Sequence, residues 1–173
     1  LASPIAGTNV GSMRGPQGPA GDAAASLFGS LVWSGGWYNP PTGQFHRLVY
    51  YSGAKMRVDR NIGGTGAVAT SDANTYLLAP ISGVYNVTMT QAWGVDNGAR
   101  GCGLGSSSVY GDQQMVCWAD IGLGRFCTAT ATVYLPANTR LYPWTWTDPG
   151  IGGMSPNDRG ITSKATIALL SAV

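Results

Sequence analysis

The chain has 173 residues, of which only 10% are charged, and its formal net charge at pH 7 is +2. That length suffices for one domain with a sizeable core and a short appendage. The arginines are scattered and form no basic stripe, so we expect no nucleic-acid partner. No apolar run approaches the roughly 18 to 20 residues that span a bilayer, so we expect no membrane insertion.

Residues 1–26 are rich in Ala, Gly, Ser and Pro and hold almost nothing to bury. Gly15, Gly18 and Gly21 recur at every third position, which is the collagen register. Three triplets are too few to hold a triple helix alone, so the alternative is a polyproline-type linker. Because the composition changes at Leu27, we divide the chain into an extended arm (1–26) and a folded head (27–173).

Short strands separated by turn residues are predicted for the first part of the head. Apolar and aromatic residues predict strands at Leu31–Trp37 and Phe45–Tyr51, with a Pro- and Gly-containing turn at Asn39–Gly43 between them. Alternation predicts a short strand at Ala54–Val58. Asn61–Asn74 is rich in Gly, Ala and Thr, and we expect it to be a flexible surface loop.

Two segments with strict alternation predict the central strands. Leu77–Trp93 is interrupted at Pro80–Gly83 and then alternates apolar with polar residues. Cys127–Leu135 alternates small or apolar residues with threonine and tyrosine. The apolar parity of these strands and of the C-terminal strand is expected to fill the core: Tyr85, Val87, Met89, Ala129, Ala131, Val133, Ile167 and Leu169.

The remaining segments complete an all-β pattern. We predict strands at Cys102–Tyr110, Met115–Ile121, Arg140–Thr147 and Thr162–Val173, and a long polar loop at Asp148–Gly160. Eight to ten short strands with frequent turn residues and no amphipathic helix predict an antiparallel β-sandwich of the jelly-roll type.

Four motifs in this order carry a resemblance to a known family: LVWSGGW, LLAPISGVYNV, ATVYLPANTRL and ATIALLSAV. They resemble the jelly-roll head that tumour necrosis factor shares with the globular heads of complement and collagen-like proteins. The resemblance spans about Leu27 to Val173. Similar heads occur in animal secreted proteins, bacterial spore-coat proteins and bacteriophage fibres. The family usually carries Gly-Asp in the turn where this chain has Asn138 and Thr139.

The resemblance implies a homotrimer whose axis is lined by one sheet. Threonine favours strands and can form hydrogen bonds across a threefold axis, and the alternative is that these side chains face water. The axis face would hold the polar parity of the matching strands: Asn86, Thr88, Thr90, Thr128, Thr130, Thr132, Tyr134, Thr166, Ala168 and Leu170.

Aromatic residues mark a candidate ligand site. The chain has six Trp and eight Tyr, and Tyr142, Trp144 and Trp146 alternate just before Asp148 and the polar loop. Exposed rings with a neighbouring carboxylate suit a sugar or protein ligand, because they offer large contact area at little cost in entropy. The alternative is that these rings face the core or a subunit interface.

No catalytic set emerges from the sequence, so we expect neither an enzyme nor a cofactor. Nothing in the sequence pattern assigns a nucleophile or an orienting carboxylate to the single histidine, His46, which we interpret as a surface or structural residue. Cys102, Cys117 and Cys127 match neither a disulfide framework nor a zinc site, and we interpret them as buried small side chains or, alternatively, one bridge from Cys102. No defined metal motif is present, although acidic loop residues such as Asp148 offer oxygens of the kind that bind calcium.

The features together suggest a homotrimeric head on the surface of a virion, at the tip of a bacteriophage fibre or tail. It would bind a host cell-surface receptor or glycan, and its N-terminal arm would contact other virion proteins. Two alternatives remain: a structural decoration or connector of a capsid, baseplate or spore surface, and a secreted collagen-like signalling head.

Overall fold

The computed structural model describes residues 26–35, 39, 43–48, 56–71, 73–94, 98–109, 111–112, 114–122, 124–148, 153–155, 157–158 and 161–173. No helix long and apolar enough to cross a membrane occurs in these residues. Their secondary structure is strand alone: β1 (Phe28–Trp33), β2 (Phe45–Arg47), β3 (Met56–Ile62), β4 (Ala67–Ala69), β5 (Thr75–Ala79), β6 (Gly83–Trp93), β7 (Arg100–Gly105), β8 (Met115–Ile121), β9 (Phe126–Leu135), β10 (Thr139–Thr147), β11 (Met154–Ser155), β12 (Asn157–Asp158), β13 (Ile161–Thr162) and β14 (Lys164–Ala172).

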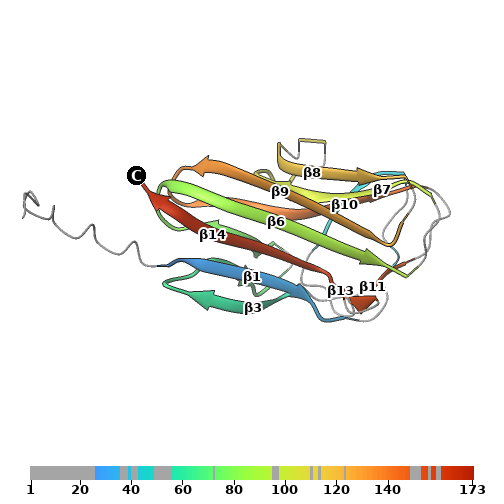
Figure 1. The fold of residues 1–173 in the computed structure, drawn as a ribbon, viewed down its shortest axis with the longest axis horizontal. Coiled ribbons are helices and arrows are strands. Elements are labelled where there is room, and N and C mark those ends of the chain that lie inside the picture. The colour runs from blue at the N-terminus through green and yellow to red at the C-terminus, as the bar shows by residue number, and fades with distance from the viewer. Residues whose placement is uncertain are drawn as a thin grey trace, which may run out of the picture.

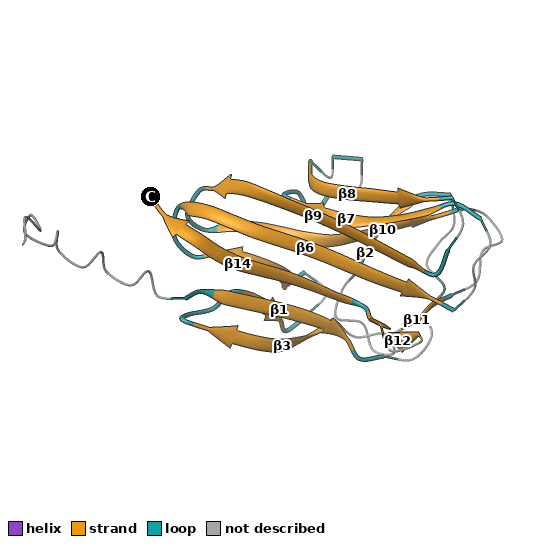
Figure 2. Cartoon of the chain, in the orientation of Figure 1, coloured by secondary structure: helices purple, strands orange, loops and turns teal. Residues whose placement is uncertain are grey.

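Two large antiparallel sheets are packed face to face (Figures 1 and 2), and β12 pairs with β13 in a separate two-stranded sheet. The first sheet has the order β9-β6-β14-β1-β3, with the short β11 paired to the end of β6. The second has the order β4-β5-β10-β7-β8, with β2 paired to β10. This arrangement confirms the predicted all-β jelly-roll sandwich.

The alternation predicted for the central strands is present in the first sheet. β6 pairs with β9 on one side and β14 on the other, so that Val87 lies beside both Ala131 and Ile167. The predicted core residues point toward the second sheet. Tyr85, Val87, Met89, Ala129 and Ile167 are buried, and Ala131, Val133 and Leu169 are partly buried against them.

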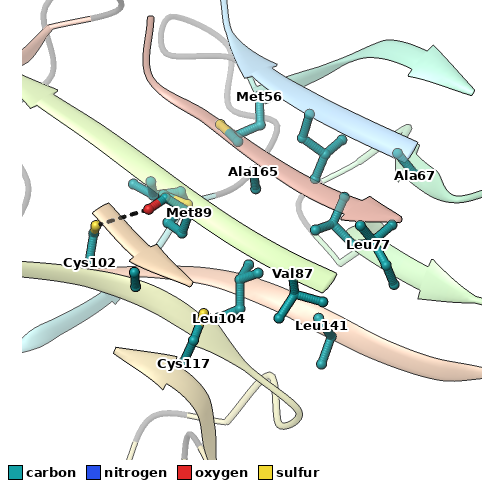
Figure 3. Close-up of a cluster of buried hydrophobic side chains, with 14 of the residues drawn as sticks. Met56, Ala67, Leu77, Val87, Met89, Cys102, Leu104, Cys117, Leu141 and Ala165 are labelled. Carbon is teal, nitrogen blue, oxygen red and sulfur yellow. Dashed lines mark hydrogen bonds between the residues drawn. The ribbon is translucent and has the colours of Figure 1, made fainter. Parts of the chain in front are cut away.

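Side chains from both sheets meet in one core (Figure 3). Leu77 and Leu141 of the second sheet lie opposite the first-sheet side chains, and all are fully buried. Cys102 also enters this core, and its thiol donates to the carbonyl oxygen of Met89 at 3.7 Å. Burying each large aliphatic side chain contributes roughly 1.5 to 3 kcal/mol, so the core supplies the main stabilisation of the fold.

The predicted loop at Asn61–Asn74 is wrong in its central part, which forms β4. The Asn61 side chain accepts from the Gly66 amide and donates to the Ala67 carbonyl, both at 3.1 Å. Gly63 adopts a φ of 70°, which glycine tolerates without strain. This turn therefore passes the chain from β3 in one sheet to β4 in the other.

Other strand bounds differ modestly from the predictions. β1 begins at Phe28 and ends at Trp33, and the weak strand predicted at Cys102–Tyr110 is β7, which ends at Gly105. The polar loop predicted at Asp148–Gly160 contains the short strands β11 and β12. Residues 36–38 and 49–55, which fall in predicted strands, lie outside the described residues. So do residues 1–25, and with them the collagen-like triplets.

The turn between β9 and β10 is formed as predicted. Asn138 has a φ of 64°, a left-handed conformation that asparagine tolerates better than most residues. Its amide donates to the Ala79 carbonyl at 2.7 Å, and the Thr139 hydroxyl donates to the Pro136 carbonyl at 2.7 Å. Asparagine thus supplies the backbone geometry for which glycine is the common choice.

Both ends of the folded head lie at the same end of the sandwich. The Leu169 amide donates to the Leu27 carbonyl at 2.9 Å, and the Val173 amide donates to the Ser82 carbonyl at 3.2 Å. The start of β1 and the C-terminus are accordingly close together at the left of Figure 1. The ends of β8 and β10 lie at the opposite end.

Candidate functional site

The outer face of the first sheet carries the residues that the resemblance places at a trimer axis; we call these ten residues the threonine face. Thr88 and Thr130 are directly opposed on β6 and β9, and their hydroxyl oxygens are 3.2 Å apart. Thr90 and Thr128 form a second pair at the same distance. The face comprises Asn86, Thr88, Thr90, Thr128, Thr130, Thr132, Tyr134, Thr166, Ala168 and Leu170.

These residues share one parity, and none of them fills the core. The β9 members are all exposed, with Tyr134 at 53%, and Leu170 on β14 is 57% exposed. The β6 members are half-buried. The face therefore combines hydroxyl groups, two large exposed apolar side chains and no carboxylate, amine or guanidinium, which makes it suitable for close packing against another surface.

The predicted ligand residues on β10 lie on the outer face of the second sheet. Tyr142 and Trp144 are only 8% and 2% exposed. Trp144 donates its indole N–H to the Ser107 carbonyl at 3.3 Å, and Tyr142 meets Tyr76 edge-on at 5.9 Å between centroids. Two arginines complete this aromatic cluster: Arg47 lies 5.4 Å from the Tyr142 ring centre and Arg140 lies 4.7 Å from that of Tyr76. Tyr142 and Trp144 thus offer little free surface to a ligand.

The neighbouring strand β7 explains why these rings are buried. Its outward positions opposite Tyr142, Trp144 and Trp146 are Gly105, Gly103 and Gly101. Because glycine has no side chain, the large rings of adjacent strands can lie flat over β7. Trp118 of β8 does so: a Cβ on Gly101 or Gly103 would overlap its indole ring.

Asp148 has a structural role at the end of β10. Its carboxylate accepts from the Ala99 amide at 3.1 Å, and its own amide donates to the Ala99 carbonyl at 2.9 Å. These two bonds connect the chain after β10 to the segment before β7. The side chain is half-buried, and it does not line the hollow described next.

Trp146, in contrast, lines a surface hollow of about 370 Å³, which we call the aromatic hollow. The rings of Phe45 and Trp118 are in contact there in a tilted arrangement, with centroids 5.0 Å apart and planes inclined at 59°. The Trp118 indole N–H donates to the Asp120 carboxylate at 2.7 Å, which fixes the ring. The described residues lining the hollow are Phe45, Ala99, Trp118, Asp120, Ile121, Gly122 and Trp146.

Sequence reasoning identified only Trp146 among these lining residues. Trp118 and Asp120 have the same parity on β8, and this spacing was visible in the sequence as WAD. The glycines at alternate positions 101, 103 and 105 were a second signal, because they leave room for rings from neighbouring strands. The convergence with Phe45 depends on the pairing of β2 with β10, which spans about 100 residues of sequence.

The titratable groups show no reactive arrangement among the described residues. His46 is half-buried, and burial, followed by the charge of Arg47, lowers its pKa. The side-chain hydrogen bond with Cys127, together with burial, raises the pKa of the Cys102 thiol, which is therefore protonated and weakly nucleophilic at neutral pH. All three cysteines are free and buried, as predicted for small core side chains. The described residues contain no group of three metal-binding side chains.

Comparisons with known proteins place the fold. No family model matches the chain, and no curated relative matches it. Murine APRIL at pH 8.0 superposes with a TM-score of 0.58 at 9% identity, covering 84% of this chain and 99% of the other. APRIL at pH 8.5 gives 0.56 at 10% identity, over 84% and 99%. Eiger TNF from S. frugiperda gives 0.53 at 10% identity, over 86% and 95%. The chain therefore has a tumour necrosis factor-like jelly-roll fold.

Proposed function

We propose that the chain forms a homotrimeric receptor-binding head, displayed on a virion surface at the tip of a bacteriophage fibre or tail. The observation that carries this proposal is the threonine face. Its ten members are uncharged, with the exposed Lys164 beside Thr90 at one end, and it exposes Tyr134 and Leu170 to solvent in the isolated chain. An exposed sheet face of this kind is an association surface, and closed symmetry is the usual way to cover one.

A threefold arrangement suits the chemistry of this face. Each hydroxyl pair, Thr88 with Thr130 and Thr90 with Thr128, uses one of its two donors, which leaves one O–H donor and acceptor capacity on both oxygens. Copies of the same face can therefore exchange hydrogen bonds across the axis while their methyl groups pack. Tyr134 and Leu170 would bury apolar area at the same time, which adds to the stability of association.

The N-terminal arm supports the same stoichiometry. Gly15, Gly18 and Gly21 have the spacing that a triple helix requires, and a triple helix needs three chains. Three copies held by the head would bring three arms together, so that the short glycine repeat gains partners it lacks alone. The arm would also be the segment that attaches the head to other virion proteins.

The assembly is tested first, on the full chain in dilute solution. Light scattering is expected to give three times the 17.9 kDa mass of one chain. Thr130→Lys places three like charges near the axis, and unpaired buried charges cost several kcal/mol, so this variant is expected to be monomeric. Thr70→Lys, at an exposed position outside the face, is the matched control and should stay trimeric. A monomeric wild-type chain, or a trimeric Thr130→Lys variant, contradicts the proposal.

The receptor role is tested with the labelled trimer. It is expected to adsorb saturably to particular bacterial strains and to compete with phage particles for them, because three weak sites act with avidity. The Thr130→Lys monomer should adsorb at least 100-fold more weakly for the same reason. Adsorption to animal cells alone would instead favour a secreted signalling head.

A further inference from the structure

We propose that the aromatic hollow binds a neutral hexopyranose, the terminal sugar of a surface glycan. This inference rests on the proposed function, because it names the chemistry that the head recognises. The hollow differs from the aromatic cluster around Tyr142 and Trp144, whose rings cover one another. Here Phe45, Trp118 and Trp146 keep part of their ring surface open around a volume of about 370 Å³.

Specific contacts hold the Trp118 ring of the hollow in a fixed position. The Trp118 ring is seated over Gly101 and Gly103, where any Cβ would displace it. Its indole N–H is bonded to Asp120 at 2.7 Å, and the Phe45 ring packs beside it at an inclination of 59°. A ring that is already held in place loses little entropy when a ligand stacks on its open part, which favours binding.

The lining matches the two faces of a pyranose. Hexopyranoses carry C–H bonds on one face and hydroxyl groups around the edge. Indole and phenyl rings offer apolar area with a negative π face for the C–H side. The Asp120 carboxylate has further lone pairs beyond the one used by Trp118, and can accept from hydroxyl groups at the ring edge. A volume of this size lies at the lower end of the usual range for small-ligand pockets, about 300 to 1,000 Å³.

The charge of the hollow selects against acidic sugars. Asp120 is the one charged side chain among the described lining residues. A sialic acid or a sulfated sugar would place its anion in the same small volume as this carboxylate, and the described lining residues include no cation to offset the repulsion. A neutral sugar meets no such penalty.

The hollow is also placed where a displayed head needs a binding site. Trp146, Ile121 and Gly122 lie near the ends of β10 and β8, at the end of the sandwich opposite the start of β1 and the C-terminus (Figure 1). A head held through its N-terminal arm therefore points this end outward, away from its support.

The test measures binding of the full-length chain to methyl glycosides of glucose, galactose, mannose and N-acetylglucosamine, with sialyllactose as the acidic comparison. The key variant is Gly122→Leu, because Gly122 lines the hollow and a Cβ there meets no heavy atom within 4 Å, so we expect a leucine to narrow the hollow without a clash. Thr70→Leu, at an exposed position outside the hollow, is the matched control. At least one neutral glycoside should bind, with a loss of about tenfold or more in Gly122→Leu and no change in Thr70→Leu.

Two further variants examine the chemistry. Trp146→Ala should weaken binding about tenfold while the thermal transition shows a folded protein. Asp120→Asn keeps an acceptor for Trp118 but removes the charge, and should weaken the neutral sugar about fivefold. Binding of no neutral glycoside, preference for sialyllactose, or undiminished binding in Gly122→Leu overturns the inference.

The two proposals fail in different ways. If the trimer adsorbs to cells and Gly122→Leu adsorbs equally, the ligand touches another surface, and the sugar site is wrong while the receptor-binding head stands. If a monomeric chain binds the glycoside and Gly122→Leu abolishes it, the sugar site stands and the trimeric head is wrong.

Discussion

Side chains alternate between core and outer face in both sheets, but the outer face of the first sheet is largely exposed whereas the aromatic rings on that of the second are mostly buried. On the first sheet, every strand of the threonine face contributes side chains of moderate size, so the face stays flat and the β9 members stay exposed. On the second, β7 contributes only glycines, and tryptophan rings from β8 and β10 occupy the space. The exposure of a strand residue therefore depends as much on the neighbouring strand as on its own parity.

The largest expected effect comes from replacing one aromatic residue on each face by alanine and comparing the losses of stability. Trp144→Ala removes a side chain that is 2% exposed and should lower the free energy of unfolding by about 4 kcal/mol. Tyr134→Ala, at 53% exposure, should change it by no more than about 0.5 kcal/mol. Both are measured by urea denaturation in the Thr130→Lys background, where association does not contribute. Equal losses would show that the two faces are not distinguished by burial.

A glycine exchange examines the cause of the contrast. Gly103→Ala places a methyl group against the Cys117 carbonyl and the Trp118 ring, and overpacking against backbone should cost about 3 kcal/mol. Gly122→Ala, which meets open space, should stay within about 0.5 kcal/mol of the wild type. A tolerated alanine at Gly103 would mean that Trp118 does not need bare backbone beneath it. The readout is again the midpoint and slope of urea unfolding.

A smaller effect is expected from the paired hydroxyls of the first sheet. A double-mutant cycle with Thr88→Val and Thr130→Val should give a coupling energy of about 0.5 kcal/mol, because only the pair can form the 3.2 Å hydrogen bond. Thr128→Val with Thr132→Val, on one strand and not opposed, serves as the reference pair and should be additive. If the changes in unfolding free energy are additive in both cycles, the Thr88–Thr130 hydrogen bond does not contribute to stability.

The smallest expected effect is a pH dependence from His46. Burial lowers its folded pKa below the ordinary 6.5, so the unfolded chain binds the proton more readily. The stability contribution is therefore fully present above about pH 6.5 and is lost as the pH falls through the folded pKa. The thermal midpoint should decline on acidification, and His46→Gln should flatten the decline. An identical decline in that variant would assign the effect to carboxylates.

The sandwich and its two central strands were predictable because their alternation is local. Between Val84 and Gln91 and between Cys127 and Leu135, the more buried side chains follow the predicted parity, whereas Ala92 is buried against it. The use of the threonine face as a trimer axis stays a prediction. The sharp turn at Asn138 was likewise predictable, because PANT is composed of turn residues.

The aromatic hollow was not predictable in the same way. Whether Trp144 is open or covered depends on Gly103 opposite it, and strand register across 40 residues of sequence is not written in either segment. Phe45 reaches Trp118 only because β2 joins the edge of β10. The alternating aromatics predict a ligand site on this sheet face, and that site stays a prediction. The hollow itself, which only Trp146 of these residues lines, could be located only from the paired strands.

The start of β1 and the C-terminus lie at the same end of the sandwich, which has a practical consequence for handling the molecule. A biotin or fluorophore added after Val173, which is 83% exposed, would tether the protein by the end that carries the arm. On a sensor chip, the ends of β8 and β10 would then face the flowing solution in every copy. A C-terminal fusion partner would lie at the opposite end and would not cover the aromatic hollow.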